Sequence, residues 1–130
     1  MDDKDTMVEH LKDLVRKFCE DRDWDQFHNP KDLAIGISTE ANELLELFRF
    51  KSEEEMRAMM REERKEIGEE LADVLYFVLR FAQKNSFDLT QELINKLKIN
   101  ERKYPVERSR GSNKKYRPWT KNAYCVSCGH

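Results

Sequence analysis

The stretch EELADVLYFVLRFA, residues 69–82, restricts the fold more than any other part of the chain. Between Leu71 and Ala82 every position is apolar except Asp73 and Arg80. A segment this apolar is stable in water only when most of its surface packs against other parts of a protein. The stretch therefore predicts a buried helix, and it raises the question of why acids stand on and beside it.

Periodic apolar segments along the rest of the chain predict an all-α protein, a bundle of four to five helices with no convincing strand. We expect helices over residues 6–20, 31–49, 53–84 with a break near 61–63, and 89–103. Asn29 and Pro30 suit the start of the second helix, and Ser52 with Glu55 fits a capping box before the next. Pro105 ends the last of these helices.

The charge of the chain changes sign along its length. Residues 1–95 carry 14 Lys and Arg against 24 Asp and Glu, whereas residues 96–130 carry 10 against 2. We expect one all-α domain over residues 1–105 and a basic, mostly irregular tail over 106–130, which is either solvated or in contact with an anion such as phosphate. A net charge of −2 disfavours nucleic acid as the partner.

Location and cysteine content give weaker constraints. No apolar run reaches the roughly 18 residues of a membrane span, and the polar, acidic first ten residues do not resemble a signal peptide. We expect a cytoplasmic protein with no membrane partner. Cys19 fits a small core residue, while Cys125 and Cys128 with His130 offer at most three metal ligands near the end of the tail, too few for a closed zinc site.

Two pairs of acids, Glu40 with Glu43 and Glu70 with Asp73, interrupt two apolar faces in the same way. On a helical wheel the first acid of each pair falls inside the apolar face, and the second lies at its margin. The two faces consist of Leu33, Ile37, Ala41, Leu44 and Phe48 in one helix and Ile67, Leu71, Val74, Leu75, Val78 and Phe81 in the other. An unpaired carboxylate buried there would be strongly destabilising. Arg80 could reach the side of Asp73, and few other cations stand near.

Four carboxylates converging from two antiparallel helices would form an all-oxygen site for Mg²⁺, with Mn²⁺ as the alternative. An ordinary buried polar network is the competing interpretation. Mg²⁺ commonly acts on phosphates, which favours phosphoryl chemistry. Lys96, Asn100 and Lys103 recur at i, i+4 and i+7 on the last helix, either as a solvated basic face or as a phosphate clamp.

Three segments, ISTEANELLELFRFK, IGEELADVLYFVLRFA and KINERKYPVERSRGSNKKY, resemble the MazG-like superfamily of all-α nucleoside triphosphate pyrophosphatases. With WDQFHNPKDL, the resemblance is closest to the dCTP pyrophosphatase branch and covers about residues 7–116. It implies Mg²⁺-dependent hydrolysis of a nucleoside triphosphate to the monophosphate and pyrophosphate. The metal ligands and catalytic acids would be Glu40, Glu43, Glu70 and Asp73, in a homodimer or a homotetramer built from dimers, with the site at a subunit interface.

The resemblance also implies how the nucleotide is held. The positions that line the base pocket are Trp24, Phe50 and Phe77, and those that hold phosphates or sugar are Lys96, Asn100, Lys103 and Tyr104. Phe50 stands where the branch often has Trp, and Phe77 where it can have Tyr, so the preferred base is not indicated. The alternative function is a catalytically silent helical bundle that binds a nucleotide or a protein partner. Loss of one of the four acids would mark it, and none is lost.

Overall fold

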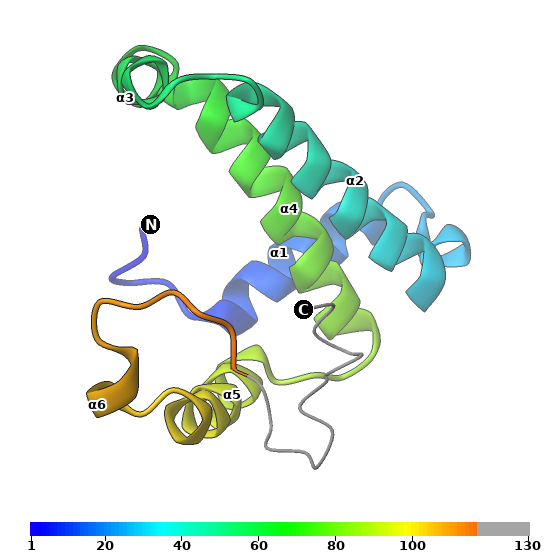
Figure 1. Ribbon diagram of the computed structural model, residues 1–130. Helices are drawn as coiled ribbons and strands as arrows, with labels where there is room; N and C mark the ends of the chain where they lie inside the picture. Colours follow the sequence, from blue (N-terminus) through cyan, green and yellow to red (C-terminus); the bar gives the residue numbers. More distant parts are fainter. Residues whose placement is uncertain (117–130) are drawn as a thin grey trace. The chain divides into compact units, whose positions relative to one another are not determined.

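The structure is a computed structural model that describes residues 1–116, and these residues contain six α-helices, one 3₁₀ turn and no strand (Figure 1). The elements are α1 (Val8–Glu20), η1 (Asp25–Phe27), α2 (Pro30–Phe48), α3 (Glu53–Glu62), α4 (Arg64–Lys84), α5 (Leu89–Lys103) and α6 (Val106–Ser109). The predicted all-α class is confirmed. No helix within residues 1–116 has the length and apolar character needed to cross a membrane.

The helix starts follow the capping residues of the sequence. The Asn29 side chain accepts a hydrogen bond from the backbone N–H of Asp32 at 2.8 Å, and Pro30 takes the first position of α2. Ser52 and Glu55 form both hydrogen bonds of a capping box at the start of α3. The predicted break in the long helical segment lies at Glu63, which separates α3 from α4.

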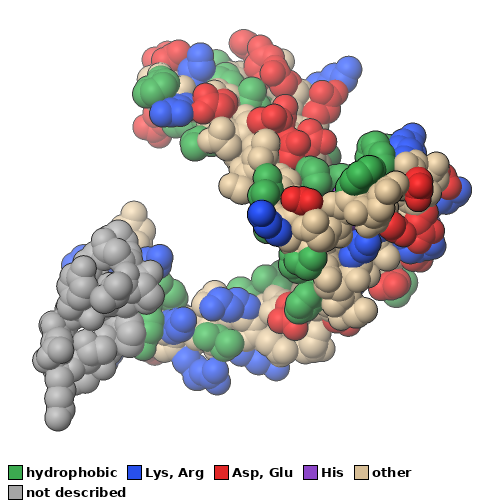
Figure 2. Space-filling model, turned by 90° about the vertical axis from the view of Figure 1, so that its right-hand side faces the viewer, with side chains coloured by type: hydrophobic (Ala, Val, Ile, Leu, Met, Phe, Trp, Pro, Cys, Tyr) green, Lys and Arg blue, Asp and Glu red, His purple; other side chains and the backbone are tan. Residues whose placement is uncertain are grey.

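The chain divides into two compact units, Met1–Asp88 and Leu89–His130. The N-terminal unit contains α1 to α4, and the C-terminal unit contains α5 and α6. Figure 2 shows blue basic side chains along the second of these units, on α5. The sequence-based boundary at residue 105 remains a prediction, and the Cys125–Cys128 motif lies outside the described residues.

In the N-terminal unit, α2 and α4 lie side by side, and α1 packs on α4 (Figure 1). The two long helices run antiparallel, since Gly36 meets Phe77 while Glu43, further along α2, meets Glu70, which stands earlier in α4. The buried apolar residues are Cys19, Leu33, Ile67, Leu79 and Ala82. The core position expected for Cys19 is therefore confirmed.

Part of the apolar face of α4 is not covered by the other helices of the N-terminal unit. The wheel predicts burial for Leu71 and Leu75, but these side chains are 57% and 47% exposed. Leu14 of α1 and Leu45 of α2 are also about half exposed, at 46% and 53%. Periodicity identified the apolar face correctly, but α1 and α2 together cover only part of it.

Candidate metal centre

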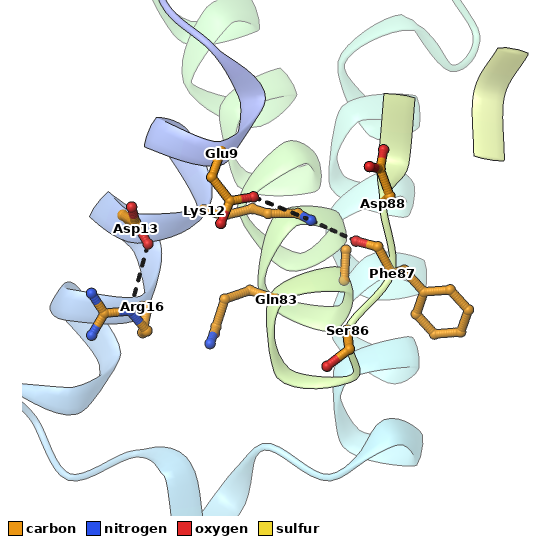
Figure 3. A pocket seen from close by; sticks show the side chains of 9 residues that line it. Glu9, Lys12, Asp13, Arg16, Gln83, Ser86, Phe87 and Asp88 are labelled. Atoms are coloured by element: carbon orange, nitrogen blue, oxygen red, sulfur yellow. Dashed lines mark hydrogen bonds and ion pairs between the residues drawn. The ribbon is translucent and has the colours of Figure 1, made fainter. Parts of the chain in front are cut away.

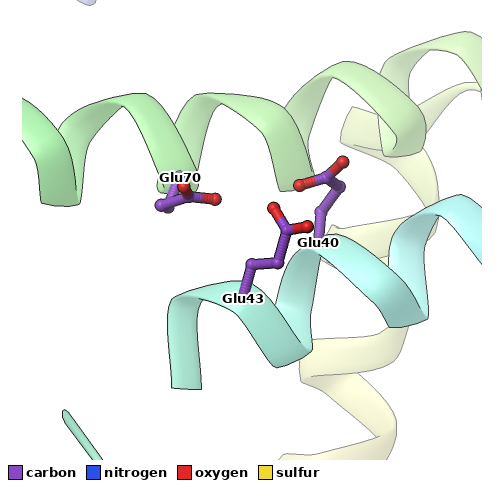
Figure 4. Close-up of side chains that lie close together, drawn as sticks. All are labelled: Glu40, Glu43 and Glu70. Carbon is purple, nitrogen blue, oxygen red and sulfur yellow. The ribbon is translucent and has the colours of Figure 1, made fainter. Parts of the chain in front are cut away.

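Three of the four acids predicted to converge do so at the contact between α2 and α4 (Figure 4). Glu40 and Glu43 stand one turn apart on α2, and Glu70 approaches them from α4. One carboxylate oxygen from each of the three lies within 4.8 Å of the others. Glu40 and Glu70 are partly buried and Glu43 is exposed, so the cluster lies at the surface of the helix pair, with two acids turned inward.

The cluster has an excess of negative charge. Oε2 of Glu40 and Oε2 of Glu70 are buried and have no hydrogen-bond partner. The pKa of Glu40 is raised to about 7 by its side-chain hydrogen bond with Glu43, by burial, and by the charges of Glu43, Asp73 and Glu70. Burial, followed by the charges of Glu43 and Asp73, also raises the pKa of Glu70. Protons or a cation are required to stabilise this arrangement.

Asp73 stands beside the three-acid cluster. Its side chain is exposed on α4, one turn beyond Glu70, and its charge acts on both Glu40 and Glu70. Its carboxylate is not among the three whose oxygens lie within 4.8 Å of one another. Three of the four predicted acids therefore converge closely, and the fourth is an electrostatic neighbour whose role as a ligand remains a prediction.

The one cation considered for these acids is used elsewhere. Arg80 is 1% exposed and donates to Asp25, to Nδ1 of His28 at 2.9 Å and to Oε1 of Gln83 at 2.6 Å. Within residues 1–116 no Lys or Arg forms an ion pair with any of the four acids. Within the N-terminal unit the carboxylate cluster is thus left without a protein cation, and its oxygen-only donors suit a divalent metal such as Mg²⁺.

The three aromatic residues predicted to line the base pocket lie in different structural environments. Trp24 precedes η1 and is 37% exposed. Phe77 lies in the contact between α4 and α2, since its ring packs against Gly36. Phe50 follows α2, is 90% exposed and has a φ of 64°, a left-handed backbone conformation that is unfavourable for a bulky residue. Sequence periodicity carried no signal for this strained backbone.

The predicted phosphate-binding residues lie in the C-terminal unit. Lys96 is exposed on α5, while Asn100 and Lys103 are partly buried. The hydroxyl of Tyr104 accepts a hydrogen bond from the backbone N–H of Tyr116 at 2.7 Å. The Lys103 ammonium lies 5.6 Å from the centre of the Tyr116 ring. The roles of these side chains in nucleotide binding remain predictions.

A separate hollow between α1 and the end of α4 is poorly suited to a triphosphate (Figure 3). It has a volume of about 420 Å³ and carries both signs of charge. Its two cations are already engaged, because Lys12 donates to the carbonyl of Phe87 at 2.5 Å and Arg16 lies 3.7 Å from Asp13. Glu9 and Asp13 on its wall would repel phosphate.

The regular structure of residues 1–116 is entirely helical, and two antiparallel helices bring carboxylates together. These features define an all-α protein with an acidic candidate metal centre. More specifically, the chain belongs to the MazG-like family, whose model matches residues 35–118. That range includes the four acids on α2 and α4 and the four predicted phosphate- and sugar-binding residues.

Individual relatives agree with this assignment. The chain is 40% identical over 111 residues to dCTP pyrophosphatase 1 of Mus musculus and 36% identical over 111 residues to dCTP pyrophosphatase 1 of Homo sapiens. Each alignment covers 84% of this chain and 65% of the relative, so the chain spans just under two thirds of the length of these proteins. A pyrophosphatase from Archaeoglobus fulgidus DSM 4304 has a similar structure, with a TM-score of 0.72 and 37% identity over 75% of this chain and 92% of that one.

Proposed function

We propose that this chain is a Mg²⁺-dependent nucleoside triphosphate pyrophosphohydrolase that converts its substrate to the monophosphate and pyrophosphate. The observation that carries the proposal is the pair of buried, unpartnered oxygens on Glu40 and Glu70, two acids whose carboxylates cluster with that of Glu43. The names of the mouse and human relatives support a dCTP-like or modified deoxynucleotide as the substrate. Such an enzyme would remove unwanted nucleotides from the cellular pool.

The acids fit a hard divalent cation. Glu40, Glu43, Glu70 and Asp73 would hold Mg²⁺, or Mn²⁺ in its place, because all four offer only oxygen donors. The bound metal would supply the positive charge that lets a triphosphate approach the acids and that stabilises charge as the α–β bond breaks. One acid of the set orients or deprotonates the water that attacks the α-phosphorus.

The other predicted residues would hold the nucleotide. Lys96 and Lys103 would neutralise the departing pyrophosphate, and Asn100 and Tyr104 would hold phosphate or sugar. Trp24, Phe50 and Phe77 would line the base pocket. The exposed ring of Phe50 supports this assignment, since an aromatic side chain kept in water by an unfavourable backbone conformation is well suited to stack on a base.

We propose that the working enzyme is a homodimer or a homotetramer in the cytoplasm. The exposed leucines of α4, Leu71 and Leu75, support an oligomer, because a partner helix would remove them from water. Light scattering combined with size-exclusion chromatography measures the mass in solution. A monomer at micromolar concentration would contradict this part of the proposal.

The activity is tested by measuring pyrophosphate release from a panel of canonical and modified NTPs and dNTPs, with Mg²⁺ and with EDTA. Glu70→Gln should reduce release at least about a hundredfold, because it removes a metal-binding charge. Glu69→Gln is the matched control: it is the same change at the preceding position of α4, where the side chain is exposed and outside the cluster.

The outcomes separate the two candidate functions. Metal-dependent release from some members of the panel, lost in Glu70→Gln and kept in Glu69→Gln, supports the enzyme and identifies its base. A folded, Mg²⁺-loaded protein that releases pyrophosphate from no member of the panel contradicts it. Nucleotide binding without hydrolysis would then favour the silent binding module.

A further inference from the structure

Arg80 places a charged group in the interior of the N-terminal unit, where few other polar side chains are buried. Its side chain is 1% exposed, and each of its three nitrogens donates to a different partner: Asp25, His28 and Gln83. The Arg80 hydrogen bond is also the main cause that holds the pKa of Asp25 below its usual value. Asp25 is 51% exposed, so only the guanidinium of this pair is buried, and burying a charged group is a poor way to gain stability because an apolar side chain of similar volume often does as well.

Two of the three partners belong to one short segment, residues 24–28, which contains Trp24 and η1. Lys84, one turn beyond Arg80 on α4, donates to the carbonyl of Asp25 at 2.9 Å. These contacts bridge more than fifty positions of sequence, since Arg80 and Asp25 are 55 residues apart. The segment is therefore anchored to α4 chiefly through Arg80.

The other end of the segment is also constrained. Asp23 has a φ of 56°, and the backbone N–H of Trp24 donates to the carbonyl of Cys19 at 3.0 Å, which closes the end of α1. The Gln26 side chain donates to the carbonyl of Asp23 at 3.0 Å. The Trp24 ring lies edge-on to His28, with their centres 6.1 Å apart. With both ends fixed, the indole has a defined orientation, and 37% of the residue stays exposed.

Trp24 is connected to the acidic helix pair by a series of ring contacts. Its ring lies 5.7 Å from Phe18, which lies 6.1 Å from Tyr76, which in turn lies 5.0 Å from Phe77. On α4, Asp73, Phe77 and Arg80 follow one another at i, i+4 and i+7, so they share one stripe of the helix. The same stripe thus carries an acid of the candidate metal centre and the group that anchors the tryptophan segment.

We propose that Arg80 is a positioning residue for base recognition, which holds Trp24 in place for stacking on the nucleobase through its bonds to Asp25 and His28. This inference rests on the proposed nucleotide pyrophosphohydrolase. The planar guanidinium is required because it serves three acceptors in fixed directions, which a lysine ammonium does not. Arg80 contacts Asp25, the first residue of η1, and His28, the residue after it, and acts on the substrate only through Trp24.

The test uses a Trp119→Phe protein as its reference, because Trp24 is then the only tryptophan in the chain. Two variants are compared in that background: Arg80→Lys, and the double variant Arg80→Met with Asp25→Asn. The double variant removes both charges together, so the half-exposed Asp25 carboxylate is not left without its partner and the fold is retained. Arg16→Gln is the control, since it breaks only the surface ion pairs that Arg16 forms with Asp13 and Glu20 on α1.

Two readouts are measured for each protein: acrylamide quenching of Trp24 fluorescence, and KM and kcat for the preferred nucleotide. In the double variant, quenching should rise and KM should increase about tenfold, the loss expected from one base-stacking contact, while kcat changes less than about threefold. Arg80→Lys should fall between the double variant and the reference. Arg16→Gln should match the reference, and the Mg²⁺ concentration for half-maximal rate should stay constant throughout.

A folded double variant with unchanged quenching and unchanged KM overturns the inference. So does a fall in kcat at constant KM, because that would place the effect on the chemical step and not on base binding. If the reference protein hydrolyses no nucleotide, the proposed function fails together with the role in base recognition. The quenching experiment still decides whether Arg80 holds Trp24, because it needs no substrate.

Discussion

Gly36 and Gly68 offer the same substitution in two opposite environments, and the structure predicts opposite effects on stability. Both lie inside helices, where Gly→Ala gains about 1 kcal/mol of helix propensity. A Cβ on Gly68 would meet nothing within 4 Å, so Gly68→Ala should realise that gain in full. A Cβ on Gly36 would lie 2.5 Å from two ring carbons of Phe77 and 2.8 Å from a third.

Carbon atoms in contact normally stand about 3.5–4 Å apart, so the Phe77 ring or a helix has to move by about 1 Å. Overpacking of this kind costs about 1–3 kcal/mol. Taking the middle of that range and subtracting the propensity gain of about 1 kcal/mol leaves Gly36→Ala less stable by about 1 kcal/mol. The two variants should then differ by about 2 kcal/mol, or roughly 8 °C in Tm for a domain of this size.

The displacement of the Phe77 ring or of a helix should also change the distances between the acids of the candidate metal centre. Gly36 stands one turn before Glu40 on α2, and Phe77 stands one turn after Asp73 on α4. Separating the helices there moves the acids of α2 away from those of α4, so Gly36→Ala should bind Mg²⁺ more weakly. Gly68→Ala should leave the affinity unchanged. Thermal unfolding followed by circular dichroism gives the stabilities, and titration calorimetry gives the affinities.

A double variant tests the cause. If the ring of Phe77 is the obstacle, adding Phe77→Leu to Gly36→Ala should cost less stability than the two changes measured separately would predict. Strict additivity would show that the clash is not the source of the destabilisation. A Gly36→Ala protein as stable as Gly68→Ala, with unaltered Mg²⁺ affinity, would refute the packing argument altogether.

Three further predictions concern the acids and the nucleotide. The pKa of Glu40 in the folded protein is about 7, above its usual value of 4.5, so the metal-free folded state binds more protons than the unfolded state over that interval and its stability should fall as pH rises from about 4.5 to 7. Glu40→Gln should flatten this pH dependence in urea titrations and abolish hydrolysis. An unchanged slope of stability against pH would contradict the assignment. Phe50→Gly should raise stability by about 1 kcal/mol, because glycine relieves the strain of the left-handed backbone, and should increase KM, whereas Phe50→Ala keeps the strain. A lower Tm for the glycine variant would argue against backbone strain at this position. Lys103→Ala should weaken triphosphate binding more than monophosphate binding in calorimetry, and equal losses would exclude a phosphate clamp.

The boundaries of the helices could be predicted because their signals are local. Asn29 caps α2 through a bond to a residue three positions away, and the capping box of Ser52 and Glu55 spans the same short distance. Such bonds form wherever the chain turns into a helix, whatever packs around it. The division at Glu63 was predicted within one or two residues for the same reason, whereas the division into units at Asp88 had no comparable signal.

The carboxylate cluster was predictable from periodicity, since Glu40 and Glu70 fall on faces that should have been apolar. Periodicity could not predict that three carboxylates lie close together while Asp73 stands apart. Helical phase gives a direction around the helix axis and not the distance to a neighbouring helix. Phase alone also predicted burial for Leu71 and Leu75, which the other helices of the N-terminal unit leave about half exposed.

The sequence by itself determined the helices, their caps and the two acid pairs, because each is set by residues within one or two turns of one another. Only the tertiary structure decided which long-range partners meet. Arg80 could have faced Asp73 on its own helix, yet it binds Asp25 from a turn 55 residues earlier. Gly36 became important because Phe77 packs against it. Such choices depend on how whole helices pack, which fixes distances that no local pattern encodes.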